Sequence, residues 1–282
     1  MIDRKIKPEP EGKVEVNLPE IKEIRLSNSL QLYYVKKDTL PIVQLNLIVP
    51  SGSIYDGTSL GLSNLTSMLI DEAAGGLTGL EISEQLDSLG SILNINSNKE
   101  YTTLSILSLE ENFTKSLDIF AKILISPDFN ESDFKRERER LNAQILNLNN
   151  DPAYLASAEL NRVVYDTTPY QFPTHGLVDT LSELNRNDIK SFYDKRYFPS
   201  GSFLIAVGSM KEEEFISVAE NYFNQWSSQG NNELKAFELN TTDKSIILLD
   251  KPDAAQSEIR VGHFSKGRKS KDFYARTVLN SV

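Results

Sequence analysis

The stretch GLSNLTSMLIDE, residues 61–72, predicts a helix around which the neighbouring elements are arranged. Its apolar residues recur at helical spacing, so one side of the helix is expected to be buried; they are Leu62, Leu65, Met68 and Leu69. Ser59 is the candidate N-cap, and Gly75-Gly76 ends the pattern. The expected helix spans residues 57–73 and follows an apolar, strand-like run at residues 41–49.

Strand-like and helix-like segments come in clusters along the chain rather than in strict alternation. Alternating or apolar segments are expected as strands, at residues 21–26, 30–36, 43–49, 91–96, 101–109, 201–208, 244–250 and 256–263. Segments with helical spacing are expected as helices, at residues 80–89, 113–124, 132–148, 153–164, 183–193, 211–223 and 272–282. Thr78 is the candidate N-cap of the helix at residues 80–89, and residues 165–178 are rich in loop signals. The clustering predicts an α+β fold, in which helices cover a mostly antiparallel sheet.

The segments before the residue 61–72 helix resemble the pitrilysin/insulinase family of zinc peptidases, which includes the processing peptidases. LSNSLQL, residues 26–32, is similar to the first hairpin of that family, and residues 41–57 are similar to the strand that leads into its metal helix. Members carry H-x-x-E-H in this helix, which supplies two histidine ligands one turn apart and a glutamate base between them. The resemblance implies a two-layer domain of the LuxS/processing-peptidase-like metallohydrolase type.

The zinc motif itself is absent. When the chain is aligned on Gly61-Leu62, Asn64 stands at the first histidine, Ser67 at the glutamate and Met68 at the second histidine. A catalytic zinc site usually takes three imidazole, thiolate or carboxylate ligands from the protein. An amide and a thioether replace them poorly, and a hydroxyl does not take a proton from a bound water near neutral pH.

The later helix shows a similar departure from the family. FKRERERLNAQI, residues 134–145, resembles the helix that carries the third ligand, a glutamate, and Gln144 stands at that position. Glu137 matches an acidic residue of the family and is retained. The chain has no Cys and two His, of which His175 is expected to hydrogen bond in a turn and His263 to be structural at a strand end. We therefore expect no catalytic residue, no zinc and no other cofactor in this chain.

Three carboxylates leave a second interpretation open. Asp71 and Glu72 lie about one turn beyond Met68, and with Glu137 they would recruit a hard cation. That interpretation makes the chain an active metallopeptidase that uses residual carboxylates. Lone carboxylate pairs usually face solvent, however, and we expect Glu137 to pair with Arg140, one turn on, across a solvated helix face.

The composition argues against nucleic acid and against a membrane span. The chain has 282 residues, of which 39% are hydrophobic and 25% charged, and its formal net charge is −10. This acidity disfavours a nucleic-acid or anionic-membrane surface, and no apolar run reaches the length of a membrane span. A basic cluster is expected to form an exposed turn; it consists of Lys266, Arg268, Lys269 and Lys271.

The sequence divides into four expected parts. Residues 1–20 are expected as a mobile N-terminal arm, and residues 21–226 as the first peptidase-like domain. Residues 227–243 are rich in Ser and Asn and are expected as a linker. Residues 244–282 resemble the start of the family's second, similar domain, which implies truncation in that domain. Because this part is too short to bury its own apolar strands, we expect it to pack on the first domain or on another copy of the chain.

The compartment is left open by the sequence. Residues 2–12 are charged and contain proline, which is not the pattern of a signal peptide. The protein would be periplasmic or otherwise extracytoplasmic if a leader was removed, and cytoplasmic if not. The absence of Cys is compatible with both.

The resemblance implies a non-catalytic zinc-peptidase homologue. In the family, paired domains form a chamber, and an inactive homologue completes the peptide-binding cavity of an active chain. This protein would then be the partner of a homologous zinc-bearing peptidase subunit in a heterodimer. It would contact peptide substrates through its walls and edge strands. A stand-alone peptide-binding module with no peptidase partner is the remaining alternative.

Overall fold

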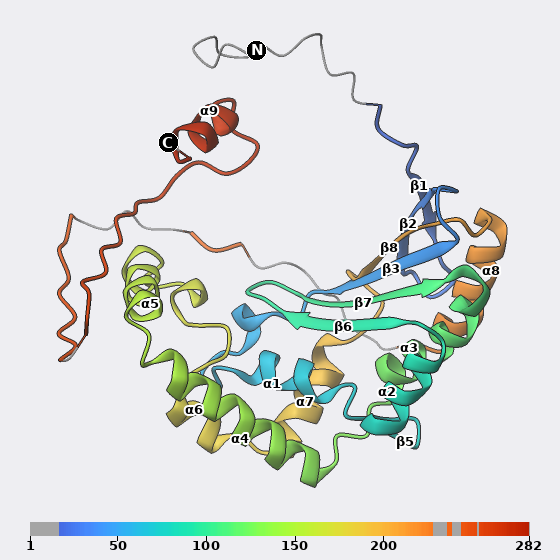
Figure 1. Ribbon diagram of the computed structural model, residues 1–282, viewed down its shortest axis with the longest axis horizontal. Helices are drawn as coiled ribbons and strands as arrows, with labels where there is room; N and C mark the ends of the chain where they lie inside the picture. Colours follow the sequence, from blue (N-terminus) through green and yellow to red (C-terminus); the bar gives the residue numbers. More distant parts are fainter. Residues whose placement is uncertain (1–16, 228–235, 239–243, 253, 282) are drawn as a thin grey trace, which may run out of the picture.

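The computed structural model describes residues 17–227, 236–238, 244–252 and 254–281 (Figure 1). At its centre lies a six-stranded sheet in the order β1-β2-β8-β3-β7-β6. Neighbouring strands are antiparallel except β2 and β8, which run parallel. The strands are β1 (Lys22–Arg25), β2 (Gln31–Lys36), β3 (Ile42–Val49), β6 (Ile92–Ser97), β7 (Thr102–Leu109) and β8 (Phe203–Gly208). The predicted α+β fold with a mostly antiparallel sheet is confirmed.

The two faces of the sheet differ because side chains alternate along each strand. On β3, Val43, Leu45 and Leu47 are fully buried, whereas Gln44 and Asn46 are half-buried. Leu45 lies opposite Ile106 of β7 and Ala206 of β8, which are also fully buried. One face of the sheet is therefore the core face, and the other is a partly exposed face of mixed polarity.

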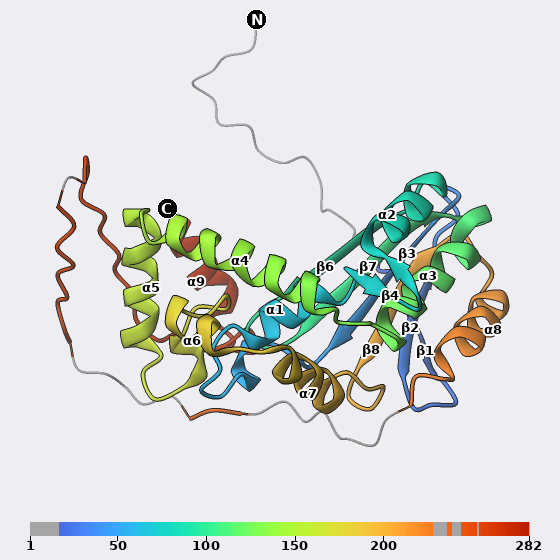
Figure 2. The same ribbon diagram turned by 90° about the horizontal axis from the view of Figure 1, so that it is seen from below.

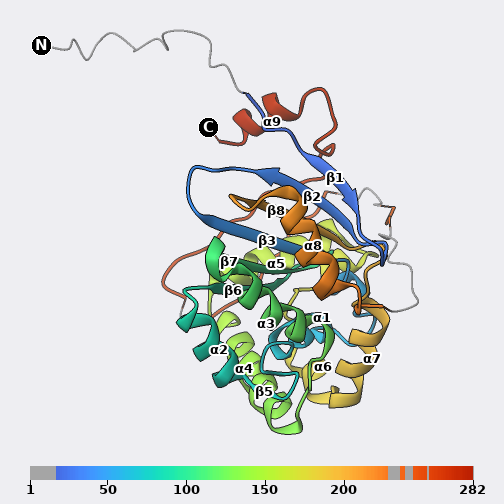
Figure 3. The ribbon, with the colours of Figure 1, turned by 90° about the vertical axis from the view of Figure 1, so that its right-hand side faces the viewer.

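Helices cover the core face, as Figures 1 and 3 show. Their apolar sides fill one continuous core, whose largest aromatic members are Phe113, Phe120, Phe215 and Phe223. Seen from below, the long helix α4 runs beside α1 (Figure 2). The covering helices are α1 (Leu62–Leu69), α2 (Gly79–Ser88), α3 (Phe113–Ile125), α4 (Glu131–Leu148), α6 (Val178–Glu183), α7 (Arg186–Arg196) and α8 (Glu212–Phe223), and α5 (Pro152–Val164) lies at one end of the domain.

Local capping explains where the observed helices depart from the expected bounds. The residue 57–73 helix is shorter than predicted, because Gly61 at the N-cap has a φ of 94° and the 3-10 helix Ser53–Tyr55 precedes it. Thr78 does cap α2, in a capping box with Glu81. The helix predicted at residues 183–193 is observed as α7, which starts later because Asn185 caps it, and the short helix α6 before it was not predicted. A short hairpin of β4 (Ala73–Ala74) and β5 (Leu77–Thr78) joins α1 to α2.

The C-terminal part differs most from expectation. Helix α9 (Phe273–Leu279) is present, but the strands predicted at residues 244–250 and 256–263 are wrong: the described residues of both segments are extended without any strand partner. A strand exists only when a neighbour satisfies its backbone groups. Most of the expected N-terminal arm and of the expected linker lies outside the described residues, and the four-part division stays a prediction.

Candidate functional site

The residues that the sequence predicts at the family's zinc positions lie on α1 and α4, which pack against each other. Asn64 and Met68 are half-buried, and Met68 packs against the hydrophobic core. Ser67 is buried, and its hydroxyl donates to the carbonyl of Asn64 at 2.7 Å. Gln144 is exposed on α4. The Ser67 hydroxyl thus hydrogen bonds to its own helix, and the Met68 side chain packs against the hydrophobic core.

The start of α1 is held by Asp56 rather than by the predicted cap Ser59. The Asp56 carboxylate accepts hydrogen bonds from the backbone N–H of Gly61 at 2.8 Å and of Ser63 at 2.9 Å. Burial raises the pKa of Asp56 to about 7, although both N–H groups and Lys99 favour its charged form. The sequence did not point to Asp56, because it lies six positions before the first residue of the helix and only the fold shows its contacts.

A cluster of charges lies where α1 ends beside α4. Glu72 accepts from Arg136 on α4, with Nη2 and Oε2 2.5 Å apart. The pKa of Asp71 is raised to about 6, first by burial and then by the nearby charges of Glu72 and Glu137. The pKa of Glu72 is also raised, first by burial and then by Glu137. The structure therefore brings together the three carboxylates named from the sequence, and their proximity helps to raise the pKa of Asp71 and of Glu72.

Glu137 is paired as predicted but is not on a solvated face. Its Oε2 lies 3.1 Å from Nε of Arg140, and its Oε1 lies 3.3 Å from Nε of Arg136. Only 2% of the Glu137 side chain is exposed. The expectation of a surface ion pair is corrected: the carboxylate is buried, and the two arginines that cover it reach solvent.

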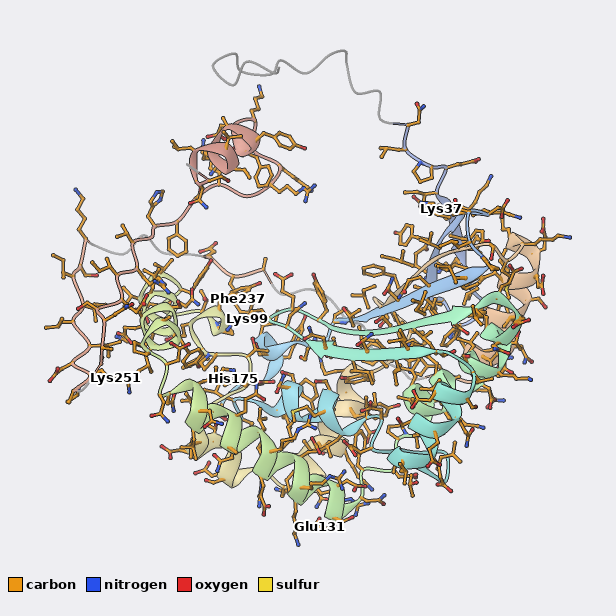
Figure 4. The ribbon with its side chains drawn as sticks, viewed as in Figure 1. Lys37, Lys99, Glu131, His175, Phe237 and Lys251 are labelled. Carbon is orange, nitrogen blue, oxygen red and sulfur yellow. The ribbon has the colours of Figure 1, made fainter. Side chains whose placement is uncertain are left out.

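A second polar group surrounds the loop before α6. The prediction that His175 hydrogen bonds in this loop is confirmed, with its Nε2 2.8 Å from the hydroxyl of Tyr154 on α5. Burial, and next the charge of Lys99, lower the pKa of His175. Lys99, from the β6–β7 turn, donates to the carbonyl of Phe172. Figure 4 shows Lys99 and His175 on the same side of the domain. The hydrogen bonds of Lys99 and His175 hold the loop before α6 in place. Nothing in the sequence indicated this role for Lys99.

The remaining positions singled out in the sequence lie outside this core. His263 is exposed and does not end a strand; its Nδ1 is 2.6 Å from the carbonyl oxygen of Phe264. The basic cluster after it is an exposed turn, as predicted.

The donor set does not fit zinc. At the positions where the sequence predicts the ligands and base lie an amide, a buried hydroxyl bonded to its own helix, a core-packed thioether and an exposed amide. Among the described residues, no three His, Cys, Asp or Glu side chains are grouped so that they could hold a metal ion. Within the same residues, no helix is long and apolar enough to cross a membrane.

Comparisons with known proteins agree with the family that the sequence resembles. The model of the insulinase family, peptidase family M16, matches residues 32–176, and the model of the M16 inactive domain matches residues 183–282. A Rickettsia felis protein described as an uncharacterized zinc protease is 26% identical over 71% of this chain and 48% of its own length. The Helicobacter pylori non-peptidase homolog YmxG is 22% identical over 81% of this chain and 53% of its own length.

Solved structures show the same fold. The M16 inactive domain protein of Pseudomonas fluorescens superposes with a TM-score of 0.72 at 21% identity, covering 79% of this chain and 54% of the other. A protease from Helicobacter pylori gives a TM-score of 0.70 at 22% identity, covering 79% and 53%. The chain spans about half the length of the curated relatives it matches. With one family model matching more than half of its residues, the chain belongs to the insulinase family of peptidases, M16.

Proposed function

We propose that this chain is a non-catalytic member of the family that binds peptide as part of a chamber built with an active, zinc-bearing homologue. One observation carries the proposal. Helices α1 and α4 pack against each other, and Asn64, Ser67, Met68 and Gln144 stand where the sequence resemblance places the ligands and base of the family. None of these four side chains supplies an imidazole, a thiolate or a carboxylate.

The sheet offers the surface for peptide contact. Strand β6 is an edge of the sheet and pairs only with β7 among the described residues. The backbone N–H and C=O groups on its outer side are therefore free to pair with an extended peptide, which would add a strand to the sheet beside α1. The partly exposed face of the sheet, with Gln44 and Asn46 of β3, forms the adjoining wall.

The partner is inferred from relatives. Among them are a processing-peptidase subunit β from Arabidopsis thaliana and subunit 1 of the bovine cytochrome b-c1 complex, which are described as subunits. The Helicobacter pylori relative is described as a non-peptidase homolog. These names support an inactive subunit that works with a second chain, and a homologue with an intact H-x-x-E-H motif is the expected partner.

Zinc analysis combined with restoration of the motif tests the loss of catalysis. The purified chain is expected to contain no stoichiometric zinc and to cleave no peptide alone. The variant Asn64→His/Ser67→Glu/Met68→His/Gln144→Glu is expected to gain one zinc per chain, because α1 and α4 already pack together. The variant without Gln144→Glu is the matched control and should bind zinc more weakly. Stoichiometric zinc in the unaltered chain would overturn the proposal.

Two further outcomes separate the alternatives. Cleavage by the chain alone that is abolished by a chelator and by Glu137→Gln would support a metallopeptidase based on the residual carboxylates. Co-purification of the tagged chain tests the partner: a homologue with an intact zinc motif supports the chamber. Peptide binding without any such homologue indicates a stand-alone module. Binding at β6 would appear as slower amide hydrogen exchange of residues 92–97 when peptide is present.

A further inference from the structure

The loop before α6, residues 165–177, is attached to the β6–β7 turn by two side-chain hydrogen bonds. Lys99 of the turn donates to the carbonyl of Phe172. The hydroxyl of Tyr170 donates to Oε1 of Glu100 at 2.6 Å. One charged side chain of each sign therefore joins the turn to the middle of the loop, and the position of the loop depends on polar contacts.

The β6–β7 turn is a fixed support for these bonds. The backbone N–H groups of Gly52, Ser53 and Ile54 donate to the carbonyls of residues 98–100 over 2.9–3.1 Å. The two segments touch so closely that a Cβ on Gly52 would lie 2.5 Å from the backbone of this turn. A change in the polar contacts is therefore expected to move the loop and to leave the turn in place.

His175 makes the third attachment, at the end of the loop. Its Nε2 lies 2.8 Å from the hydroxyl of Tyr154 on α5. Burial, and next the charge of Lys99, lower the pKa of His175. Among the residues that the structure describes, no carboxylate pairs with this imidazole. The closed loop thus holds a neutral histidine beside a buried cation, and a second positive charge there would have no counterion.

The carboxylates around Lys99 do not provide that counterion. Glu100 already accepts from Tyr170. Asp56 is buried and accepts from the start of α1, and burial raises its pKa to about 7, although the charge of Lys99 favours its ionised form. Asp56 therefore takes up a proton at a higher pH than His175 does. Below neutral pH the positive charge of Lys99 remains without that negative charge.

The backbone on either side of the loop suits a hinge. Thr167 is exposed and has a φ of 67°, a left-handed conformation that disfavours a β-branched residue. Gly176 also has a positive φ, of 77°, and is held against Leu60 at the start of α1. The part between them can therefore move while Gly176 stays in place, and movement can relieve the unfavourable backbone of Thr167.

The remaining ring contacts of the loop are uncharged. Tyr165 meets Phe264 edge to face, and Tyr170 meets Phe237 in the same way. These contacts do not change with pH between 5 and 8. The groups that can titrate there lie within the first domain, on the loop, on the β6–β7 turn and at the start of α1.

We propose that residues 168–175 form a pH-operated latch, which is closed while His175 is neutral and is released when His175 takes up a proton beside Lys99. Because the pKa of His175 is lowered in the closed loop, the open loop binds the proton more readily. The closed state is therefore fully favoured above the ordinary histidine value of about 6.5 and is lost as the pH falls below it. This inference does not depend on the loss of zinc or on a peptidase partner.

Amide hydrogen exchange of residues 165–177 in the full chain, corrected for the intrinsic effect of pH, tests the latch. Protection is expected to fall about fivefold between pH 7.5 and pH 5.5. His175→Gln keeps a side chain that can bond to Tyr154 but cannot become charged, so its protection should stay constant. His263→Gln is the matched control at an exposed histidine outside the loop and should respond like wild type. A wild-type loop with constant protection, or a response that survives His175→Gln, would overturn the proposal.

The titration of the imidazoles by NMR tests the cause without relying on a variant of the latch. The chain has two histidines, and the His263→Gln spectrum shows which signal belongs to His175. His175 should titrate at a lower pH in the folded chain than in urea, and Lys99→Gln should move this titration back toward the value in urea. The fall in protection of the loop should be smaller in Lys99→Gln as well. A folded-state titration at or above the value in urea would reject the latch.

Discussion

Arg136 on α4 joins Glu72, which follows α1, by an ion pair of 2.5 Å. The same guanidinium reaches Asp133 at 2.7 Å and Glu137 at 3.3 Å on its own helix. Its positive charge therefore compensates the negative charges of the three carboxylates that lie where α1 and α4 meet. Ion pairing and core packing thus hold α1 and α4 together in this chain.

Arg136→Ala is expected to lower the free energy of unfolding by about 1 kcal/mol, since the partly exposed arginine is screened by solvent. The loss should be larger at pH 8 than at pH 5, because Glu72, whose pKa is raised by burial and by the charge of Glu137, is then more fully ionised and lacks its cation. Urea denaturation at both pH values measures the effect. Arg162→Ala, which removes the exposed pair with Glu159 on α5, is the control and should change stability less. Equal losses in the two variants would contradict the prediction.

Asp71 is expected to make the fold less stable as the pH rises. Its pKa is raised to about 6 in the folded chain, so the folded state holds a proton that the unfolded state has released. The associated stability is complete below the unfolded value of about 4 and is lost as the pH rises through about 6. Asp71→Asn lacks this titration and should gain about 1–2 kcal/mol over wild type at pH 7.5.

Unfolding free energies of the Asp71→Asn variant and of wild type, measured from pH 4 to 8, check this prediction. Near pH 4 the wild-type side chain is protonated, so the two proteins should be about equally stable there. A difference that is the same at every pH would mean that the substitution acts through packing rather than through charge.

The sequence predicts the first domain well because its signals are local. The alternation of β3, the helical spacing of α3 and the N-cap at Thr78 depend on residues a few positions apart, and the structure confirms all three. The site was predictable only in part. The identities of Asn64, Ser67, Met68 and Gln144 are visible in the sequence, but the burial of Glu137 and the cap from Asp56 depend on which elements meet.

The residue 244–263 segments show where local signals fail. Residues 246–249 form an apolar run and residues 256–263 alternate, which is why strands were expected there. Whether a strand forms, however, is decided by a neighbour for its backbone, and the described residues contain none for these segments. A high strand propensity means that the residues suit a sheet, but the neighbouring strand must come from elsewhere in the fold.

Asp56→Ala is expected to destabilise the domain by about 2–3 kcal/mol, since it leaves two buried N–H groups at the start of α1 without acceptors. Ser59→Ala should have an effect below about 0.5 kcal/mol, because the structure assigns the capping role to Asp56. Chemical denaturation of both variants distinguishes the two candidate caps. A larger loss of unfolding free energy in Ser59→Ala than in Asp56→Ala would show that Ser59, the residue predicted from the sequence, caps α1.

Gly176 fixes the loop before α6 against the start of α1. It has a φ of 77°, and a Cβ there would collide with the backbone of Leu60 and lie 2.7 Å from Cα of Gly61. Gly57 is a matched control, because its φ of 61° is similarly positive but a Cβ there has nothing within 4 Å. Both Ala variants carry the cost of a left-handed backbone, about 1 kcal/mol. Gly176→Ala alone adds the clash and should lose more than about 3 kcal/mol in urea denaturation. Similar losses in the two variants would show that the loop moves freely away from α1, and that the close approach of Gly61 and Gly176 does not position the site.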